Sequence, residues 1–173
     1  MSCLWLERSE RNDKKYEKIL GFVETLGGMD WEIITFKKYA EGTNYEGLYY
    51  GNQAGCDKLK GKNLVIIGTP YTVDDRYKLV AHYLGVDASR KEDFRPHRQR
   101  IEYNGYSFQH TTYKNELLRE IQAYSISSEL EQAVGRARLL REECTVLLFS
   151  SFPCEQAQIH EKDYLAMGCI NLK

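Results

Sequence analysis

The 173-residue sequence contains no apolar run approaching the roughly 20 residues that a membrane-spanning helix needs, which argues against a membrane partner. Residues 1–8 become charged too early to form a secretory signal peptide. None of the five cysteines belongs to a C-x-x-C pair, so the sequence offers no zinc-binding pattern and we expect no metal site. An odd number of cysteines without a secretory leader predicts reduced thiols in a cytoplasmic protein.

The sequence also lacks an excess of either charge. Its net charge of −1 gives no overall basic field, so any contact with nucleic acid requires a local patch. Hydrophobic residues make up 42% of the chain, which is enough for a buried core at a length typical of one domain. No internal repeat divides the chain, and we predict a single domain over residues 1–173.

Two patterns typical of ATP hydrolysis are missing as well. The sequence has no G-x-x-x-x-G-K-[ST] loop to cradle a β-phosphate, and no D-E-x-[DH] pattern to hold magnesium and orient water. Phosphoryl transfer depends on positioning and charge stabilisation by such groups. We therefore expect no ATP hydrolysis by this chain alone.

Apolar periodicity predicts alternating helices and strands. Helices are expected from about 12 to 26, 72 to 84, 114 to 124, 128 onward and 155 to 165, and strands over 31–36, 64–67 and 145–150. The wholly apolar run 64–67 is typical of a parallel strand covered on both faces. This alternation predicts an α/β fold with a mainly parallel sheet and helices on both faces.

Several local signals refine the prediction. Ser128 with Glu131, and Thr72 with Asp75, have the spacing of a capping box at a helix start. For the helix after Thr72, the predicted inner face consists of Tyr77, Val80, Ala81 and Leu84. For the helix after Ser128, it consists of Leu130, Ala133, Val134 and Ala137. Asn104-Gly105 between alternating apolar residues predicts a β-hairpin, inserted at about residues 95–113.

The most informative segment is Glu131–Arg138, in which Gln132, Gly135, Arg136 and Arg138 form the pattern Q-x-x-G-R-x-R. It resembles motif VI of superfamily 2 helicases, whose arginines reach the nucleotide phosphates across a cleft between two domains. Arginine suits this role because it stays charged and grips phosphate oxygens with a planar fork. The resemblance implies that Arg136 and Arg138 act in catalysis, and that Gln132 and Gly135 contact the nucleotide.

A second segment resembles motif V of the same helicases, a Gly-x-Asp loop before an apolar strand. Here Gly55 and Asp57 precede the Leu64–Ile67 run. The resemblance implies that Gly55 permits close backbone approach to the nucleotide and that Asp57 accepts a ribose hydroxyl. Strand 31–36 occupies the place of motif IV. Together these segments imply a three-layer RecA-like fold, namely the second RecA-like domain of such a helicase.

The implied partners are ATP with Mg²⁺, a DNA or RNA strand, and a first RecA-like domain in cis or in trans that holds most of the nucleotide. Five residues are predicted to contact nucleic acid: Lys37 and Lys38 after strand 31–36, Thr69 at the end of strand 64–67, and Arg98 and Arg100 in a basic stretch beside the hairpin. Aromatic residues of the hairpin, Tyr103, Tyr106 and Phe108, would supply stacking.

Other interpretations of these residues remain open. Many helicases place the second arginine where this chain has Leu139, and Tyr49 occupies the position of a phosphate-binding threonine. Arg136 and Arg138 would splay by about 200° on a regular helix, so that one of them faces solvent or pairs with Glu131 or Glu142. Asp57 and Thr69 also fit ordinary turns. The alternatives to a helicase domain are a non-catalytic interaction module or a flavodoxin-like nucleotide binder.

Overall fold

The computed structural model describes residues 10–26, 30–40, 48–52, 57–86, 94–155, 157–158 and 169–172; at 10–12, 157–158 and 169–172 it describes the backbone alone. The elements, in chain order, are α1 (Glu10–Thr25), β1 (Trp31–Ile34), α2 (Lys37–Ala40), β2 (Asn63–Ile67), α3 (Asp74–Tyr83), β3 (His97–Tyr103), β4 (Tyr106–Thr112), α4 (Glu116–Gly135), β5 (Val146–Phe149), β6 (Ala157–Gln158) and β7 (Cys169–Leu172).

The main sheet has the strand order β1-β2-β5-β7-β6. Strands β1, β2 and β5 are parallel, as predicted, and the central strand β2 pairs with both neighbours. Strand β7 pairs antiparallel with β5, and β6 pairs antiparallel with β7. The chain is therefore an α/β protein whose small parallel sheet continues into an antiparallel pair.

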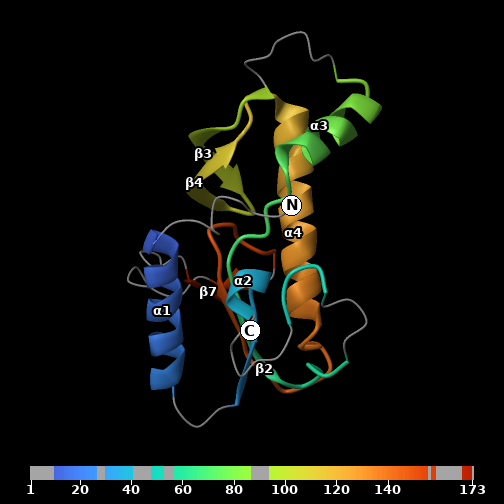
Figure 1. Ribbon diagram of the computed structural model, residues 1–173. Coiled ribbons are helices and arrows are strands. Elements are labelled where there is room, and N and C mark those ends of the chain that lie inside the picture. Colours follow the sequence, from blue (N-terminus) through green and yellow to red (C-terminus); the bar gives the residue numbers. More distant parts are fainter. Residues whose placement is uncertain are drawn as a thin grey trace.

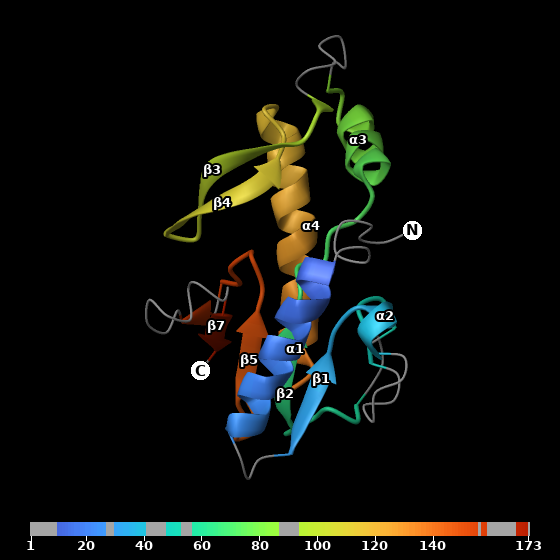
Figure 2. The same cartoon turned by 60° about the vertical axis from the view of Figure 1, so that its left-hand side comes forward.

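Helices α1 and α4 lie on opposite faces of this sheet (Figures 1 and 2). Side chains alternate between the two faces of a strand, so neighbouring residues of β2 enter different clusters. Leu64 and Ile66 pack with Leu130 and other residues of α4, whereas Val65 packs with Ile19 of α1. The wholly apolar sequence of β2 follows from this burial on both faces.

Helix α4 is one continuous element, so the predicted start of a new helix at Ser128 is wrong. The helix begins after Asn115, whose side-chain Oδ1 accepts a 3.0 Å hydrogen bond from the Leu118 amide. Ile126, Ser127 and Leu130 are buried at helical spacing across the predicted break, and this packing outweighs the local capping signal. The predicted inner face, Leu130, Ala133, Val134 and Ala137, is buried as expected.

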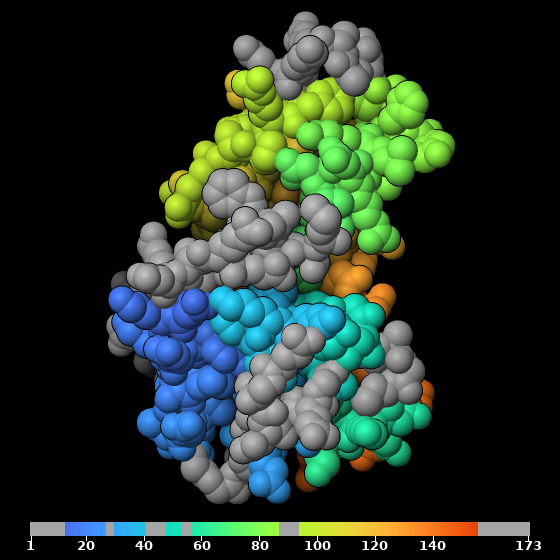
Figure 3. Space-filling view, viewed as in Figure 1, coloured from blue at the N-terminus to red at the C-terminus, as the bar shows by residue number. Residues whose placement is uncertain are grey.

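Helix α3 begins at Asp74, and its N-cap Val73 makes no side-chain capping bond, so the capping box predicted at Thr72 is absent. Instead, the Tyr77 hydroxyl accepts a 2.9 Å hydrogen bond from the Thr72 amide. Tyr77 and Ala81 are buried as predicted, but Val80 and Leu84 are 40% and 60% exposed. Part of the predicted inner face therefore lies on the surface, where α3 projects at the upper right of Figure 3.

Strands β3 and β4 form a separate two-stranded antiparallel sheet, joined by Asn104 and Gly105, which both have positive φ angles of 50° and 76°. This turn geometry matches the Asn-Gly signal. The pair lies beside the N-terminal half of α4 (Figure 1). Tyr103 and Phe108 contact the ring of Phe152, with centroid distances of 4.7 Å and 5.6 Å, so these aromatic side chains pack inward.

The helix predicted over 155–165 is not found at Ala157 and Gln158, which form strand β6. The rest of that prediction lies outside the described residues. No helix in the described part of the chain is long and apolar enough to cross a membrane.

Candidate functional site

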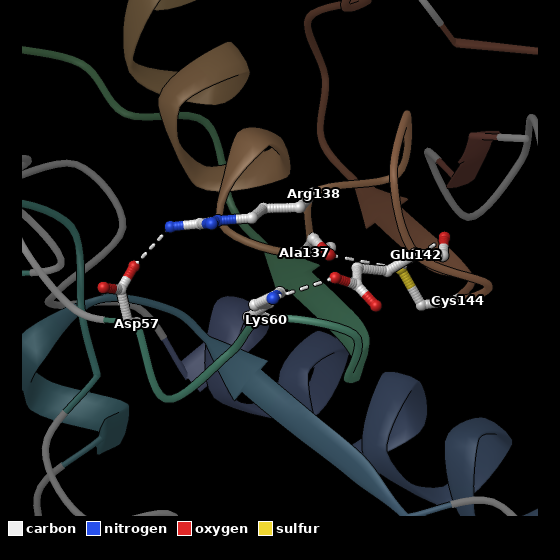
Figure 4. Close-up of polar contacts among 6 residues, drawn as sticks. All are labelled: Asp57, Lys60, Ala137, Arg138, Glu142 and Cys144. Carbon is white, nitrogen blue, oxygen red and sulfur yellow. Dashed lines mark hydrogen bonds and ion pairs between the residues drawn. The ribbon is translucent and has the colours of Figure 1, made fainter.

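The two segments that resemble helicase motifs meet at one edge of the parallel sheet. Asp57 precedes β2, and Arg138 lies between α4 and β5. Because β2 and β5 are parallel neighbours, the segments that enter them lie side by side at the amino ends of the strands. The Arg138 Nη2 donates a 2.7 Å hydrogen bond to Asp57 Oδ1 (Figure 4). A carboxylate and a guanidinium from segments 81 residues apart thus share one site.

The arginines lie beyond the helix, and not on it as predicted. Helix α4 ends at Gly135, and Arg136 is its C-cap, with φ −65° and ψ −30°. Arg138 has a φ of 57°, in the left-handed region. For a residue with a β-carbon this conformation costs roughly 1–2 kcal/mol, and it persists only where surrounding contacts hold it.

Hydrogen bonds hold the backbone of Arg138 through its own amide, which donates to the Gly135 carbonyl at 3.1 Å, and through the two peptide carbonyls around it. The Ala137 carbonyl accepts from the Gly61 amide at 3.1 Å and from the Cys144 thiol at 3.4 Å. The Arg138 carbonyl accepts from the amides of Arg141 and Glu142, at 2.8 Å and 3.1 Å. Both peptide planes around the Arg138 Cα are therefore fixed.

An ion pair ties the same two loops together. Lys60 Nζ lies 3.1 Å from Glu142 Oε1 (Figure 4). Lys60 directly precedes Gly61, whose amide bonds the Ala137 carbonyl. Burial, and after it the charge of Glu142, raises the pKa of the Cys144 thiol. The thiol is therefore protonated near neutral pH and retains one hydrogen, for which the Ala137 carbonyl at 3.4 Å is the nearer acceptor and the Glu142 carbonyl at 3.7 Å the farther one.

A pocket of about 260 Å³ opens next to Arg138. Its lining combines two arginines, one carboxylate, one glycine and three aliphatic side chains: Glu131, Val134, Gly135, Arg138, Leu139, Leu140 and Arg141. Gly135 is exposed, and a β-carbon added there would meet no atom within 4 Å. Nothing within the described chain therefore requires a glycine at this position, which stays accessible to a molecule from outside.

The remaining predicted nucleotide residues differ in their surroundings. Gln132 is exposed on the last turn of α4. The Nε of Arg136 is buried and has no hydrogen-bond partner among the described residues. Gly55 lies outside the described residues.

The residues predicted to contact nucleic acid lie elsewhere. Lys38 Nζ lies 2.9 Å from Asp13 Oδ1, which also accepts a 2.7 Å hydrogen bond from the Tyr39 hydroxyl. Together the Tyr39 hydrogen bond and the Lys38 ammonium lower the pKa of the Asp13 carboxyl. Lys37 Nζ lies 6.0 Å from the centre of the Tyr49 ring. Lys38 is thus part of a contact between α1 and α2.

Thr69 follows β2 at the opposite, carboxyl edge of the sheet, and only 2% of it is exposed. Its hydroxyl lies 3.0 Å from Ser150 Oγ and 2.8 Å from Ser151 Oγ, and it accepts a 2.9 Å hydrogen bond from the Ser151 amide. The Thr69 side chain therefore joins the loops that leave β2 and β5.

Arg98 and Arg100 lie on the exposed face of β3, and the Arg100 Nε donates a 2.7 Å hydrogen bond to Ser107 Oγ of β4. The structure therefore separates the predicted residues into three places. Asp57, Gln132, Gly135, Arg136 and Arg138 occupy the amino edge of the parallel strands and the nearby end of α4. Lys37, Lys38 and Thr69 follow the carboxyl ends of β1 and β2, and the two β3 arginines lie on the separate β3–β4 sheet.

Lys60 and Cys144 were not among the predicted site residues, and Glu142 was predicted only as a possible partner for an arginine. No local pattern marks these residues, because their contacts join segments that are distant in the sequence. No group of three or more His, Cys, Asp or Glu side chains is placed to hold a metal ion within the described ranges. In comparisons with known proteins, the chain matched no family model, no curated protein and no solved structure.

Proposed function

We propose that this chain is the C-terminal RecA-like domain of a superfamily 2 helicase, acting on DNA or RNA with ATP and Mg²⁺. The observation that carries this proposal is the 2.7 Å contact between Arg138 and Asp57. The segments that resemble motifs V and VI form one site, as the common role of these motifs in binding nucleotide requires.

In this proposal, Arg138 contacts the γ-phosphate of ATP and Arg136 supports it from the helix end. The Arg138 side chain is only partly buried, and the pocket beside it carries a second guanidinium, that of Arg141. A phosphate group would compete with the Asp57 carboxylate for the Arg138 fork, since both offer paired oxygens. Asp57, once released, would be available to a ribose hydroxyl.

The first RecA-like domain supplies the phosphate-binding loop and the magnesium-binding carboxylates, which this chain lacks. Closure of the two domains would bring ATP to the amino edge of β2 and β5, and hydrolysis would release it. The protein would act in the cytoplasm, because an odd number of cysteines favours reduced thiols.

Nucleic acid would contact the outer face of β3. Arg98 and Arg100 are exposed there, while Tyr103 and Phe108 pack inward against Phe152. Contacts to the sugar-phosphate backbone are therefore favoured over stacking of bases on these two aromatic residues. Lys37 and Lys38, both exposed after β1, are the further candidates near the sheet, and the Lys38 ammonium would exchange its contact with Asp13 for a phosphate.

The test is ATP turnover by this domain joined to its first RecA-like domain. Arg138→Ala is expected to abolish turnover while nucleic-acid binding stays within about twofold, because the lost guanidinium contacts the nucleotide phosphates and not the nucleic acid. Arg95→Ala, at an exposed arginine that precedes β3 and lies outside the Asp57–Arg138 site, is the matched control and should retain full turnover. Equal turnover in the Arg138→Ala and wild-type proteins would overturn the assignment.

A second candidate, a non-catalytic interaction module, is favoured by one observation. Four apolar residues of α3 and the turn that follows it are exposed at 40% or more: Leu79, Val80, Tyr83 and Leu84. Spaced one helical turn apart in two pairs, they form a stripe of the kind that docks on another protein. Under this alternative, Leu79→Asp would abolish partner binding and Arg138→Ala would leave it unchanged. The helicase proposal instead expects Arg138→Ala to abolish ATP turnover and Leu79→Asp to leave turnover unchanged.

A further inference from the structure

The left-handed backbone of Arg138 distinguishes this arginine from its neighbours. Among the non-glycine residues that the structure describes, only Asn104 and Arg138 have positive φ angles. Asn104 lies in a hairpin turn, where asparagine favours this conformation. Arg138 has no such preference, and its conformation is held by local hydrogen bonds, among them one of 3.1 Å from its own amide to the Gly135 carbonyl, together with contacts from other segments.

Those contacts act on both sides of the Arg138 Cα. Its φ and ψ angles are the rotations between the Ala137–Arg138 and Arg138–Leu139 peptide planes. The first plane is held through the Ala137 carbonyl by the Gly61 amide and the Cys144 thiol, and through the Arg138 amide by the Gly135 carbonyl. The second is held through the Arg138 carbonyl by the amides of Arg141 and Glu142.

The two donors to Ala137 come from separate segments, one before β2 and one before β5. Ala137 itself is fully buried, so the peptide cannot move toward other partners without opening the core. The Lys60–Glu142 ion pair spans the Gly61 loop and the loop that carries Cys144. The carbonyl of Ala137 is therefore a junction of three segments of the chain.

We infer that the Cys144 thiol and the Gly61 amide are positioning groups for Arg138. By holding the Ala137 carbonyl, they maintain the left-handed backbone that directs the Arg138 guanidinium toward Asp57 and the adjoining pocket. Neither Gly61 nor Cys144 lines the pocket beside Arg138. The hydrogen bonds from the Gly61 amide and the Cys144 thiol to the Ala137 carbonyl are called the clamp below. The inference rests on the proposed function only in assigning a phosphate to Arg138, and the clamp does not depend on that assignment.

The test uses the complete 173-residue chain, isotope-labelled for NMR, with the variants Cys144→Ala and Cys144→Ser. The three-bond HN–Hα coupling and the ¹³Cα shift of Arg138 report its φ angle. In Cys144→Ala both should move toward right-handed or averaged values, because one of the two bonds to Ala137 is lost. In Cys144→Ser they should stay near the wild-type values, since a hydroxyl can donate the same bond.

Cys154→Ala is the matched control, because it removes a buried thiol outside the clamp. It should leave the Arg138 signals unchanged. Unchanged signals in Cys144→Ala would overturn the inference. If that variant does not fold, amide hydrogen exchange in the wild-type chain decides: slow exchange at Gly61 supports the clamp, and exchange at the rate of an exposed loop contradicts it.

Affinity for inorganic pyrophosphate, measured on the same samples, separates this inference from the proposed function. Cys144→Ala is expected to weaken binding about threefold, with recovery in Cys144→Ser, because a single hydrogen bond is removed. If the wild-type chain does not bind pyrophosphate but the Arg138 signals respond to Cys144→Ala, the phosphate role is lost and the positioning role is supported.

Discussion

Arg138 and Asp57 lie 81 positions apart in the sequence, and a 2.7 Å hydrogen bond joins their side chains at the amino edge of the parallel strands. The side chain of Asp57 is 79% exposed and that of Arg138 is 39% exposed. Because an exposed ion pair is screened by water, it contributes little to the free energy of unfolding. The contact therefore matters more for what Arg138 can bind than for the stability of the fold.

The first prediction concerns this pair. Asp57→Asn should change the free energy of unfolding by less than about 1 kcal/mol and should strengthen pyrophosphate binding, since the competing carboxylate charge is removed. Arg138→Ala should abolish the same binding. Urea denaturation and calorimetric titration measure the two effects. Weaker pyrophosphate binding by Asp57→Asn would show that Asp57 does not compete for Arg138.

The second prediction concerns Gly68, which follows β2 with a φ of 109°. A β-carbon there would lie 2.2 Å from the ring of buried Phe36. Gly68→Ala is expected to destabilise the protein by about 2–4 kcal/mol, through overlap and backbone strain together. Urea denaturation measures this change. The control is Gly21→Ala on α1, where no atom lies within 4 Å; there a gain of about 0.5–1 kcal/mol is expected.

The third prediction distinguishes the observed start of α4 from the one that the sequence suggests. Asn115→Ala should cost about 1 kcal/mol, because the Leu118 amide loses its capping acceptor. Ser128→Ala should be neutral or slightly stabilising, because Ser128 lies inside the helix. Thermal unfolding of both variants measures the difference. A larger loss in Ser128→Ala than in Asn115→Ala would indicate that a helix begins at Ser128.

The fourth prediction concerns pH. Burial lowers the pKa of His110 to about 4, and its ring contacts those of Tyr71, Phe108 and Phe152. A histidine in the unfolded chain takes up a proton near pH 6.5, whereas buried His110 stays neutral until about pH 4. The free energy of unfolding should therefore be highest above pH 6.5 and fall as the pH drops toward 4. The expected loss is about 3 kcal/mol.

Chemical denaturation at pH 7 and pH 4.5 tests this expectation in the wild-type protein and in His110→Phe. The variant should lose less stability between the two pH values, because it has no proton to take up at this position. His82→Gln, at an exposed histidine on α3, is the control and should behave as the wild-type protein does. An equal loss in His110→Phe would assign the pH dependence to other groups.

Much of the fold follows from local sequence. The apolar run of β2, the positive φ angles at Asn104-Gly105 and the buried stripe from Leu130 at the end of α4 to Ala137 just beyond it were each predictable, because periodicity and turn chemistry act over short distances. The predictions failed where packing outweighed local signals. Burial of Ile126 and Leu130 keeps α4 continuous across Ser128, and α3 begins without the capping box predicted for it.

For the candidate site, the sequence by itself determined which groups are available: two arginines behind a glutamine and a glycine, and an aspartate ahead of an apolar strand. Only the tertiary structure decided that Arg138 meets Asp57, that Thr69 is buried, and that Cys144 and Gly61 share the Ala137 carbonyl. The physical reason is that the parallel pairing of β2 and β5 brings distant segments to one edge of the sheet and so sets these contacts. The immediate neighbours of a residue do not encode which strands will lie side by side.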